Sequence, residues 1–279
     1  MLTIEVKYRP IRWLPFLRKV ERIVPQNWGD VTQEQLISIS SLYKSAISDL
    51  AFLKAMSGLK KGILSNLSDF ELYKMMEILE YVGDQKPFPE FIIRQIKLRW
   101  QWSLSLSGWS KGTILYAPQP KLKGVTFGRF IFADTYFANY QQYGDETDLN
   151  KFIASLYLGK NEKFEEHLIQ ERFAAIGKLE LNIRQAIVLN FQLIHEWLAL
   201  AYPLIFQKLA STALRSTSDT SLEAPVAEPV EAKDPNTWIK VFQNFVGDDI
   251  IHDEVWAAKP VNTIFAYMTR KYKENAKRK

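Results

Sequence analysis

Ser110 is the first residue whose spacing suggests chemistry, because Gly108, Ser110 and Gly112 form the pattern G-x-S-x-G. In serine hydrolases this pattern holds the nucleophile on a sharp turn between a strand and a helix, with an acid and a histidine downstream. Here the next residues, TILYAPQP, favour an extended segment followed by a break, and the sequence does not alternate between strand and helix patterns. We therefore predict a simple turn at Ser110.

The chain has no cysteine and three histidines, so thiolate chemistry is excluded and few residues remain for metal binding or base catalysis. His195 begins a pattern similar to a zinc-binding helix, but Ala199 stands where the second histidine is needed. His252 lies beside Asp253 and Glu254, a group that could bind a divalent ion, although acidic residues are also typical of a first helical turn. We predict no catalytic residue, no metal site and no cofactor, and hence a protein that is not an enzyme.

Two capping boxes mark the starts of helices in the first hundred residues. Thr32 with Gln35, and Ser68 with Glu71, have the S/T-x-x-E/Q spacing in which each side chain accepts a hydrogen bond from the other residue's backbone amide. Apolar residues then recur every three or four positions, as in an amphipathic helix, whereas the residues before the first box alternate as in a strand. The elements predicted are a hairpin of residues 2–9 and 19–24, a helix of residues 32–56 and a helix of residues 68–81.

The middle of the chain favours β structure. Residues 112–116 and 125–132 are rich in β-branched and aromatic residues, and APQPKLKG between them excludes a helix. We predict a short hairpin or an irregular excursion there. Helical periodicity resumes over residues 149–158, 163–176 and 181–209.

Neither the opening of the chain nor its longest apolar run indicates a membrane. Residues 186–206 are long enough to span one, but polar residues such as Asn190 and Glu196 favour a buried core helix, so we predict no membrane partner. The opening MLTIEVKYRPIRWLP is interrupted by Lys7 and Arg9 and is unlike a signal peptide. We predict a cytoplasmic protein that is not secreted by a signal peptide.

A change in composition near residue 210 predicts the domain organisation. Residues 211–235 concentrate Ser, Thr, Ala, Glu and Pro without an aromatic residue, which is typical of a flexible acidic linker. The predicted fold class is mainly α: a helical domain of residues 1–210 with a small N-terminal hairpin and a central β excursion, then a tethered helical unit of residues 236–279. That unit is either an interaction device on a tether, which the sequence favours, or the end of the same core. It ends in RKYKENAKRK, which holds six cations and one anion.

Aromatic and basic side chains are the candidates for binding, because such residues anchor many protein interfaces. The candidate protein-interaction residues are Trp28, Trp238, Phe242, Trp256, Phe265, Tyr267, Arg270 and Lys271. A second hypothesis is a nucleic-acid-binding module that uses the basic tail and a central group of stacking rings and cations. That central group comprises Trp100, Trp102 and Trp109 beside Arg94, Lys97 and Arg99.

The stretch VPQNWGDVTQEQ resembles a known family through its P-x-x-W-x-[DE]-[VL]-T-x-x-Q pattern, formed by Pro25, Trp28, Asp30, Val31, Thr32 and Gln35. A similar opening occurs in phage and prophage proteins of Bacteroidetes-type viruses, and GVTFGRFIFADTYFANY followed by LNKFIASLYL is similar to a later segment of those proteins. The resemblance covers scattered points over residues 20–205. It implies a non-enzymatic tail-morphogenesis protein, a tail assembly chaperone, whose partner is the tape-measure protein or another tail component.

Overall fold

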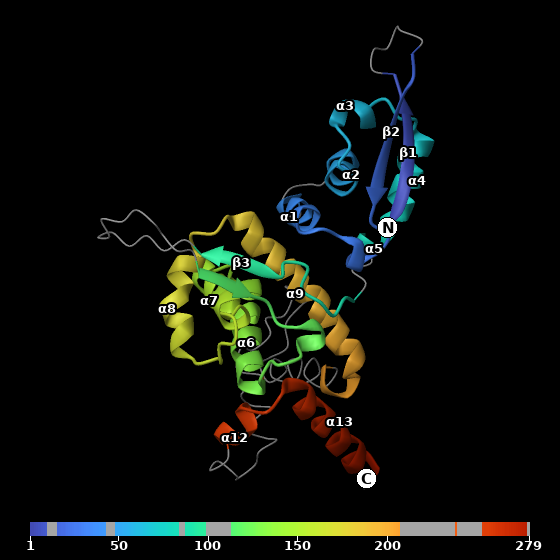
Figure 1. Ribbon diagram of the computed structural model, residues 1–279. Helices are drawn as coiled ribbons and strands as arrows, with labels where there is room; N and C mark the ends of the chain where they lie inside the picture. The colour runs from blue at the N-terminus through green and yellow to red at the C-terminus, as the bar shows by residue number, and fades with distance from the viewer. Residues whose placement is uncertain are drawn as a thin grey trace, which may run out of the picture. The chain divides into compact units, whose positions relative to one another are not determined.

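The chain is mainly helical, with two small two-stranded antiparallel sheets in the part that the structure describes (Figure 1). The computed structural model describes residues 1–9, 16–42, 48–83, 87–98, 113–206, 238 and 253–277. Two compact units are present, unit 1 of residues 1–88 with 181–196 and unit 2 of residues 89–180 with 197–279. The predicted mainly α class is confirmed. The predicted linker, residues 211–235, lies outside the described residues, and so do its boundaries.

Unit 1 joins a hairpin to a set of short helices. Strands β1 and β2 pair antiparallel from Leu2 opposite Val24 to Tyr8 opposite Arg18, which confirms the predicted hairpin. Its core includes buried Val6, Val24 and Leu36. The elements are β1 (Leu2–Tyr8), β2 (Arg18–Val24), the 3-10 turn η1 (Trp28–Asp30), α1 (Gln33–Leu42), α2 (Asp49–Ser57), α3 (Lys61–Leu64), α4 (Asp69–Ile78), α5 (Glu80–Gly83) and the first part of α9 (Leu181–Ala201).

Charged side chains support the pairing of β1 with β2 on the exposed side of the hairpin. Glu5 lies directly opposite Glu21, an arrangement that is unfavourable for two like charges. The Nζ atom of Lys19 lies 2.6 Å from the Glu5 carboxylate and 3.2 Å from that of Glu21, so one cation offsets the repulsion. The hydrogen bond from Lys19 lowers the pKa of Glu5, and the two carboxylates raise the pKa of Lys19.

Both predicted capping boxes are present. The Thr32 amide donates to Gln35 Oε1 at 2.8 Å and the Gln35 amide donates to Thr32 Oγ1 at 3.2 Å, so α1 begins at Gln33. Ser68 and Glu71 exchange the same two hydrogen bonds at the start of α4. The Gln35 side chain also donates to the Met56 carbonyl at 2.6 Å, which joins the first turn of α1 to the last turn of α2.

The prediction of one continuous helix over residues 32–56 is wrong. Helix α1 ends at Leu42, and α2 begins after Ser48, whose side chain accepts a hydrogen bond from the Ala51 amide. Serine competes for backbone hydrogen bonds in the interior of a helix and is favoured at its N-cap. The apolar period continues across both helices, so periodicity alone did not reveal the new start at Ser48.

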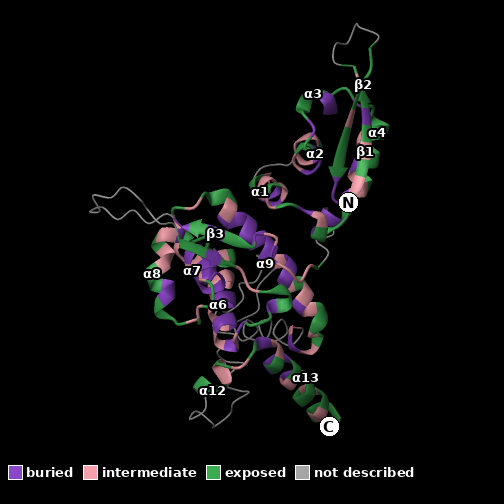
Figure 2. Ribbon diagram, in the orientation of Figure 1, coloured by how far each residue is buried: buried purple, intermediate pink, exposed green. Residues whose placement is uncertain are grey.

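Unit 2 contains the longer helices around a second hairpin. Each of the helices α6, α7 and α8 contains buried residues, which Figure 2 colours purple, and α7 is buried over most of its length. Gly144, at a φ of 70°, ends α6 in the left-handed conformation that glycine adopts without strain, and α7 follows directly. The elements are β3 (Gln95–Leu98), β4 (Thr113–Tyr116), the 3-10 turn η2 (Pro120–Leu122), α6 (Phe127–Tyr143), α7 (Glu146–Leu156), α8 (His167–Ile176), the end of α9, α12 (Asp253–Ala257) and α13 (Val261–Lys277).

The prediction of β structure for residues 112–116 and 125–132 is correct for the first segment and wrong for the second. Residues 113–116 form a strand, but β4 pairs with the preceding β3. Residues 127–132 start helix α6 instead of a strand, because the Thr126 side chain accepts a hydrogen bond from the Arg129 amide. The buried residues of α6, Phe127, Arg129, Phe130, Ala133 and Asp134, include pairs three and four positions apart, the spacing of a helix. Aromatic content predicted a strand there, whereas burial of one helical face determined the outcome.

The end of the described chain belongs to the core of unit 2. The Phe127 amide donates to the Lys259 carbonyl at 2.8 Å, and the Val261 amide donates to the Val125 carbonyl at 2.9 Å. The Asn262 side-chain amide donates to the Lys121 carbonyl at 2.8 Å. These hydrogen bonds attach the start of α13 to α6 and to the segment before it, within unit 2.

Helix α9 contains most of the apolar stretch considered as a membrane span. Its side chains Ile187, Phe191, Ile194 and Leu198 are all buried in the protein. The helix ends at Ala201, before Pro203. None of the helices in the described ranges is both long enough and apolar enough to cross a membrane.

Replacing Ser68 with Ala removes one side of the second capping box. We expect Ser68→Ala to lower the free energy of unfolding by about 1 kcal/mol, because the Glu71 backbone amide in the first turn of α4 loses its acceptor. The matched control is Ser65→Ala, an exposed hydroxyl that donates only to the Lys61 carbonyl, for which we expect a change within about 0.5 kcal/mol. Urea unfolding followed by circular dichroism measures both, and equal effects of the two substitutions would contradict the capping role.

Candidate functional site

Trp28 lies in the core of unit 1. Its side chain is 3% exposed and makes an edge-to-face contact with Tyr81, with the ring centroids 5.6 Å apart. Burial raises the pKa of the Tyr81 hydroxyl, and the nearby Asp30 carboxylate raises it further. A ring this deeply buried offers almost no surface to a partner, so Trp28 stabilises the fold in this conformation.

Trp238 is the centre of an aromatic cluster in unit 2. Its ring is 4% exposed and stacks on Phe265 at 5.5 Å between centroids. The indole Nε1 donates a hydrogen bond to the carboxylate of Asp134, which satisfies both polar groups in a buried place. The other rings around Trp238 are Phe127, Phe130 and Phe206. Trp238 and Phe265 are therefore core residues that hold α6, the residues after α9 and α13 together.

A second aromatic pair lies at the surface of unit 2. Trp256 of α12 and Tyr267 of α13 are partly exposed, with ring centroids 5.8 Å apart. The Lys259 Nζ atom lies 3.9 Å from the centre of the Trp256 ring. The Arg270 guanidinium carbon lies 5.1 Å from the Tyr267 ring centre, and the Lys271 Nζ atom lies 5.7 Å from it. We call Trp256, Lys259, Tyr267, Arg270 and Lys271 the aromatic–cationic surface.

Helix α13 separates this surface from the core. Its buried residues, Val261, Ile264, Phe265 and Met268, follow helical spacing and form one face. Tyr267, Arg270 and Lys271 also share a face, since positions three and four apart are neighbours on a helix. Glu274 extends that face, with a carboxylate 3.9 Å from Arg270 Nε and 3.6 Å from Lys271 Nζ. These ion pairs are exposed and therefore weak.

The structure brings four of the predicted interaction residues together in this surface: Trp256, Tyr267, Arg270 and Lys271. It places Trp28, Trp238 and Phe265 in cores, and Phe242 lies outside the described residues. Sequence reasoning missed Lys259. Its position three residues after Trp256 was the available signal, because residues with that spacing in a helical segment come close together.

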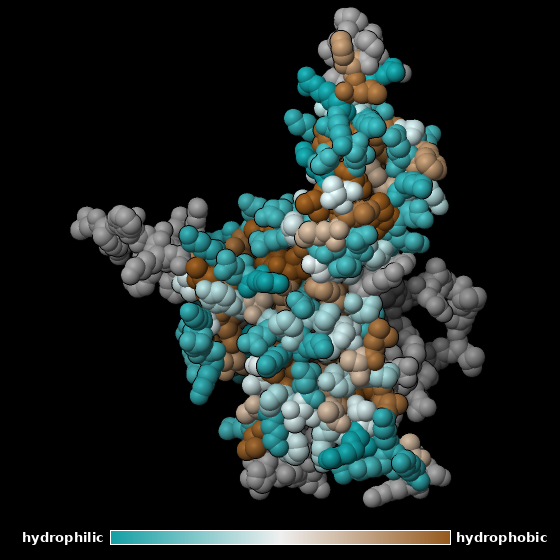
Figure 3. Space-filling model, turned by 45° about the vertical axis from the view of Figure 1, so that its right-hand side comes forward, coloured by the Kyte–Doolittle hydropathy of each residue, from teal (hydrophilic) through white to brown (hydrophobic). Residues whose placement is uncertain are grey.

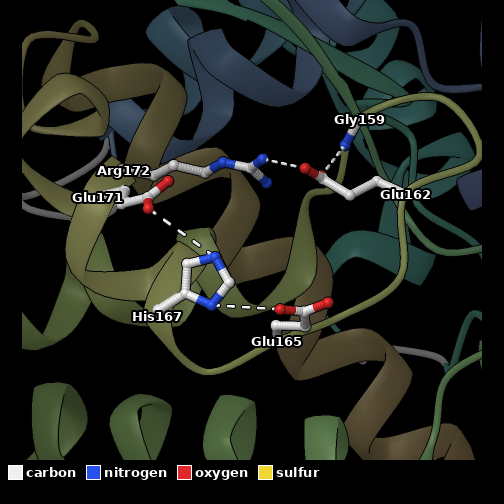
Figure 4. A network of polar contacts seen from close by, with 6 residues as sticks. All are labelled: Gly159, Glu162, Glu165, His167, Glu171 and Arg172. Atoms are coloured by element: carbon white, nitrogen blue, oxygen red, sulfur yellow. Dashed lines mark hydrogen bonds and ion pairs between the residues drawn. The ribbon is translucent and has the colours of Figure 1, made fainter.

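A polar network in unit 2 joins the segment after α7 to α8 (Figure 4). The Glu162 carboxylate accepts hydrogen bonds from the Arg172 guanidinium and from the Gly159 amide, the latter at 2.6 Å. The hydrogen bond from Arg172 lowers the pKa of Glu162. In the same view, His167 lies 3.3 Å from Glu165 and is largely exposed.

Arg129 provides a related buried contact at the end of α7. Its Nε donates to the Ser155 carbonyl at 2.9 Å, and its guanidinium also donates to the Leu156 carbonyl. These carbonyls belong to the last turn of α7, where the backbone lacks helical partners and a cation is favourable. Burial lowers the pKa of Arg129 to about 10, opposed by the charge of Glu162. Arg129 and Glu162 therefore have structural roles that the geometry accounts for.

The structure describes only some of the residues that the sequence suggested for catalysis or metal binding. Ser110, with its G-x-S-x-G pattern, and His252 lie outside the described residues. The His195 ring contacts Phe191, with centroids 6.1 Å apart. Within the described ranges, no group of three or more His, Cys, Asp or Glu side chains is placed to hold a metal ion.

Two further pairs of large hydrophobic side chains are exposed in the described part of the chain. Hydrophobic residues, in brown, are scattered among hydrophilic ones on the face that Figure 3 shows. Phe16 and Leu17, directly before β2, are exposed. Phe70 and Tyr73 are exposed on α4, where Lys74 lies 5.3 Å from the Phe70 ring centre. The hairpin group adjoins residues 10–15, which the structure does not describe, and the α4 group has a single cation against a ring.

The sequence also suggested a group of cations and aromatic rings for nucleic-acid stacking. The structure describes only two members of that group. Arg94 and Lys97 are exposed, beside and within β3. The remaining members of that group, residues 99–109, lie outside the described part of the chain. Comparisons with protein-family models, with curated proteins and with solved structures found no match to this chain.

Removing the Trp238 ring tests its role in the core. We expect Trp238→Ala to lower the free energy of unfolding by about 3–5 kcal/mol, because aromatic contacts are lost and a cavity is left. Trp256→Ala is the matched control, and we expect it to cost less than about 1 kcal/mol because that ring is partly exposed. Urea unfolding by circular dichroism measures both, and a small effect of Trp238→Ala would show that the cluster is not a stabilising core.

The Glu162 network predicts a pH dependence. Its folded-state pKa lies below the ordinary value of 4.5, so the contribution to stability is present above that value and is lost as pH falls through the folded-state pKa. At neutral pH we expect Glu162→Gln to cost up to about 1 kcal/mol, and the difference from the wild type should shrink as the pH falls below 4.5 and through the folded-state pKa. Glu165→Gln, at an exposed position, is the control. A difference that stays constant with pH would contradict the ion pair as its cause.

Proposed function

We propose that this protein is a non-enzymatic binding protein of phage or prophage tail assembly. In this role it acts as a chaperone for the tape-measure protein or another tail component in the cytoplasm of the bacterial host. The carrying observation is the aromatic–cationic surface, where Trp256, Tyr267, Arg270 and Lys271 lie together and remain partly or largely exposed. Tryptophan, tyrosine and arginine are the residues that most often anchor protein interfaces. The resemblance of VPQNWGDVTQEQ to tail-morphogenesis proteins supplies the biological setting.

The attachment of α13 to unit 2 supports a binding role for this surface. Val261 and Asn262 are hydrogen-bonded to the segment before α6, and Phe265 is buried in the aromatic cluster. The exposed face of α13 therefore belongs to a helix whose opposite face is packed within unit 2. A surface that is already ordered loses less conformational entropy on binding than a flexible one.

Nucleic-acid binding is the second candidate function. The observation in its favour is the row of exposed cations at the end of α13, namely Arg270, Lys271, Lys273 and Lys277. Such a row can neutralise phosphates and release counterions, so the affinity should fall steeply with salt. An affinity that does not change with salt would count against this candidate.

A pulldown from cells that express the full chain with its neighbouring genes tests the leading proposal. We expect the wild-type protein to recover a tail component, and Trp256→Ala/Tyr267→Ala to recover much less, because both exposed rings of the surface are removed. Phe70→Ala/Tyr73→Ala is the matched control, since it removes an exposed aromatic pair from α4.

Three other results of this pulldown would each be informative. Failure of the wild type to recover any tail component would overturn the proposal. Equal recovery by both double variants would show that another surface makes the contact. Recovery of nucleic acid alone, removable by moderate salt, would support the second candidate.

A further inference from the structure

The charges around the aromatic–cationic surface indicate what kind of partner it fits. Lys259 lies over the face of Trp256, and Arg270 and Lys271 lie against Tyr267. An aromatic ring is negative over its face and positive at its edge. Each of the two rings therefore has at least one cation against it, and the group combines aromatic rings with three positive side chains.

The exposed face of α13 keeps this positive character. Arg270 and Lys271 side chains are 65% and 47% exposed, so both can approach a partner. Glu274 is within 4 Å of both, but one carboxylate cannot neutralise two cations. The surface thus retains a net positive charge next to apolar ring carbon.

The same geometry disfavours base stacking as the main mode of binding. Single-stranded nucleic acids bind stacking platforms through the open faces of aromatic rings. In Trp256 one face is occupied by the Lys259 ammonium group at 3.9 Å, and in Tyr267 two cations lie within 6 Å of the ring centre. A carboxylate needs no ring face, because it can contact the cations and the positive ring edges together.

We propose that the aromatic–cationic surface binds an acidic, amphipathic segment of a partner protein. Carboxylates of that segment pair with Lys259, Arg270 and Lys271, and its apolar side chains pack on Trp256 and Tyr267. Tyr267 lies about one turn before Arg270 and Lys271 on α13, so a partner helix whose acidic residues lie one turn from its apolar residues, about 5 Å along its axis, matches the spacing. This inference rests on the proposed function, because it specifies the chemistry of the tail component that is bound.

A defined probe tests the inference with the full chain. The probe is a fluorescein-labelled peptide of about 18 residues, or five helical turns, built from Leu, Ala and Glu with the Glu residues one turn apart. A second peptide carries Gln in place of every Glu. We expect fluorescence anisotropy to show binding of the Glu peptide and at least fivefold weaker binding of the Gln peptide, because only the former pairs with the cations.

Protein variants locate the contact. We expect R270E/K271E to weaken binding of the Glu peptide roughly tenfold and R270Q/K271Q to weaken it less, in proportion to the charge removed. K74E is the matched control, because Lys74 lies over an exposed aromatic ring on α4 and its reversal should leave binding unchanged. Circular dichroism melting confirms that each variant is folded, and an R270E/K271E protein that unfolds is replaced by R270Q/K271Q.

Three outcomes would overturn the inference. They are equal binding of the Glu and Gln peptides, equal binding by the wild type and the folded charge variants, and tighter binding of a labelled oligothymidine of about 16 nucleotides than of the Glu peptide.

The pulldown separates failure of this inference from failure of the proposed function. If the wild type and R270E/K271E recover a tail component equally well, the acidic-segment inference fails and the proposed function stands. If the Glu peptide binds as expected but no tail component is recovered, the surface chemistry stands and the proposed function fails.

Discussion

The burial of Trp238 and Phe265 against α6 is the interaction on which unit 2 and its exposed surface depend. Their rings stack on each other, and Asp134 accepts the indole hydrogen bond in the same buried place. Phe265 is on the inner face of α13, so its burial fixes which face of that helix points outward. The position of Tyr267 and Arg270 at the surface follows directly, because they lie on another side of the same helix.

Backbone hydrogen bonds strengthen this arrangement at the point where the chain enters α13. The Lys259 carbonyl accepts from the amide of Phe127, the first residue of α6, and the Val261 amide donates to Val125 before α6. The Lys259 ammonium group also lies over the Trp256 ring. Lys259 therefore contributes a backbone hydrogen bond to the packing of unit 2, and its side chain forms part of the aromatic–cationic surface. Gly128 lies beside Ala257, and a side chain there would come within 3.2 Å of the Ala257 Cβ, so α12 packs closely on α6.

The polar interior of unit 2 is organised around ends of secondary structure. Arg129 donates to carbonyls of the last turn of α7, and Glu162 accepts from the Gly159 amide and from Arg172. Both charged groups thereby satisfy backbone atoms that helix and sheet hydrogen bonds leave unpaired. Tyr157 adds a hydrogen bond from its buried hydroxyl to the Ile93 carbonyl at 2.7 Å, which connects the end of α7 to the segment before β3. These contacts explain why titratable groups are buried here without any need for a reaction.

The sequence by itself determined the features that depend on residues within about four positions of one another. The capping boxes at Thr32 and Ser68, the amphipathic pattern of α13 and the alternation of apolar and polar residues within the strand β1 are all of this kind. Only the tertiary structure decided that β4 pairs with β3, that residues 127–132 enter a helix, and that Trp238 and Phe265 are core residues whereas Trp256 and Tyr267 are partly exposed. Composition could not distinguish these aromatic residues, because Trp238 and Phe265 are buried by contacts with residues of α6 that lie more than a hundred positions earlier in the chain.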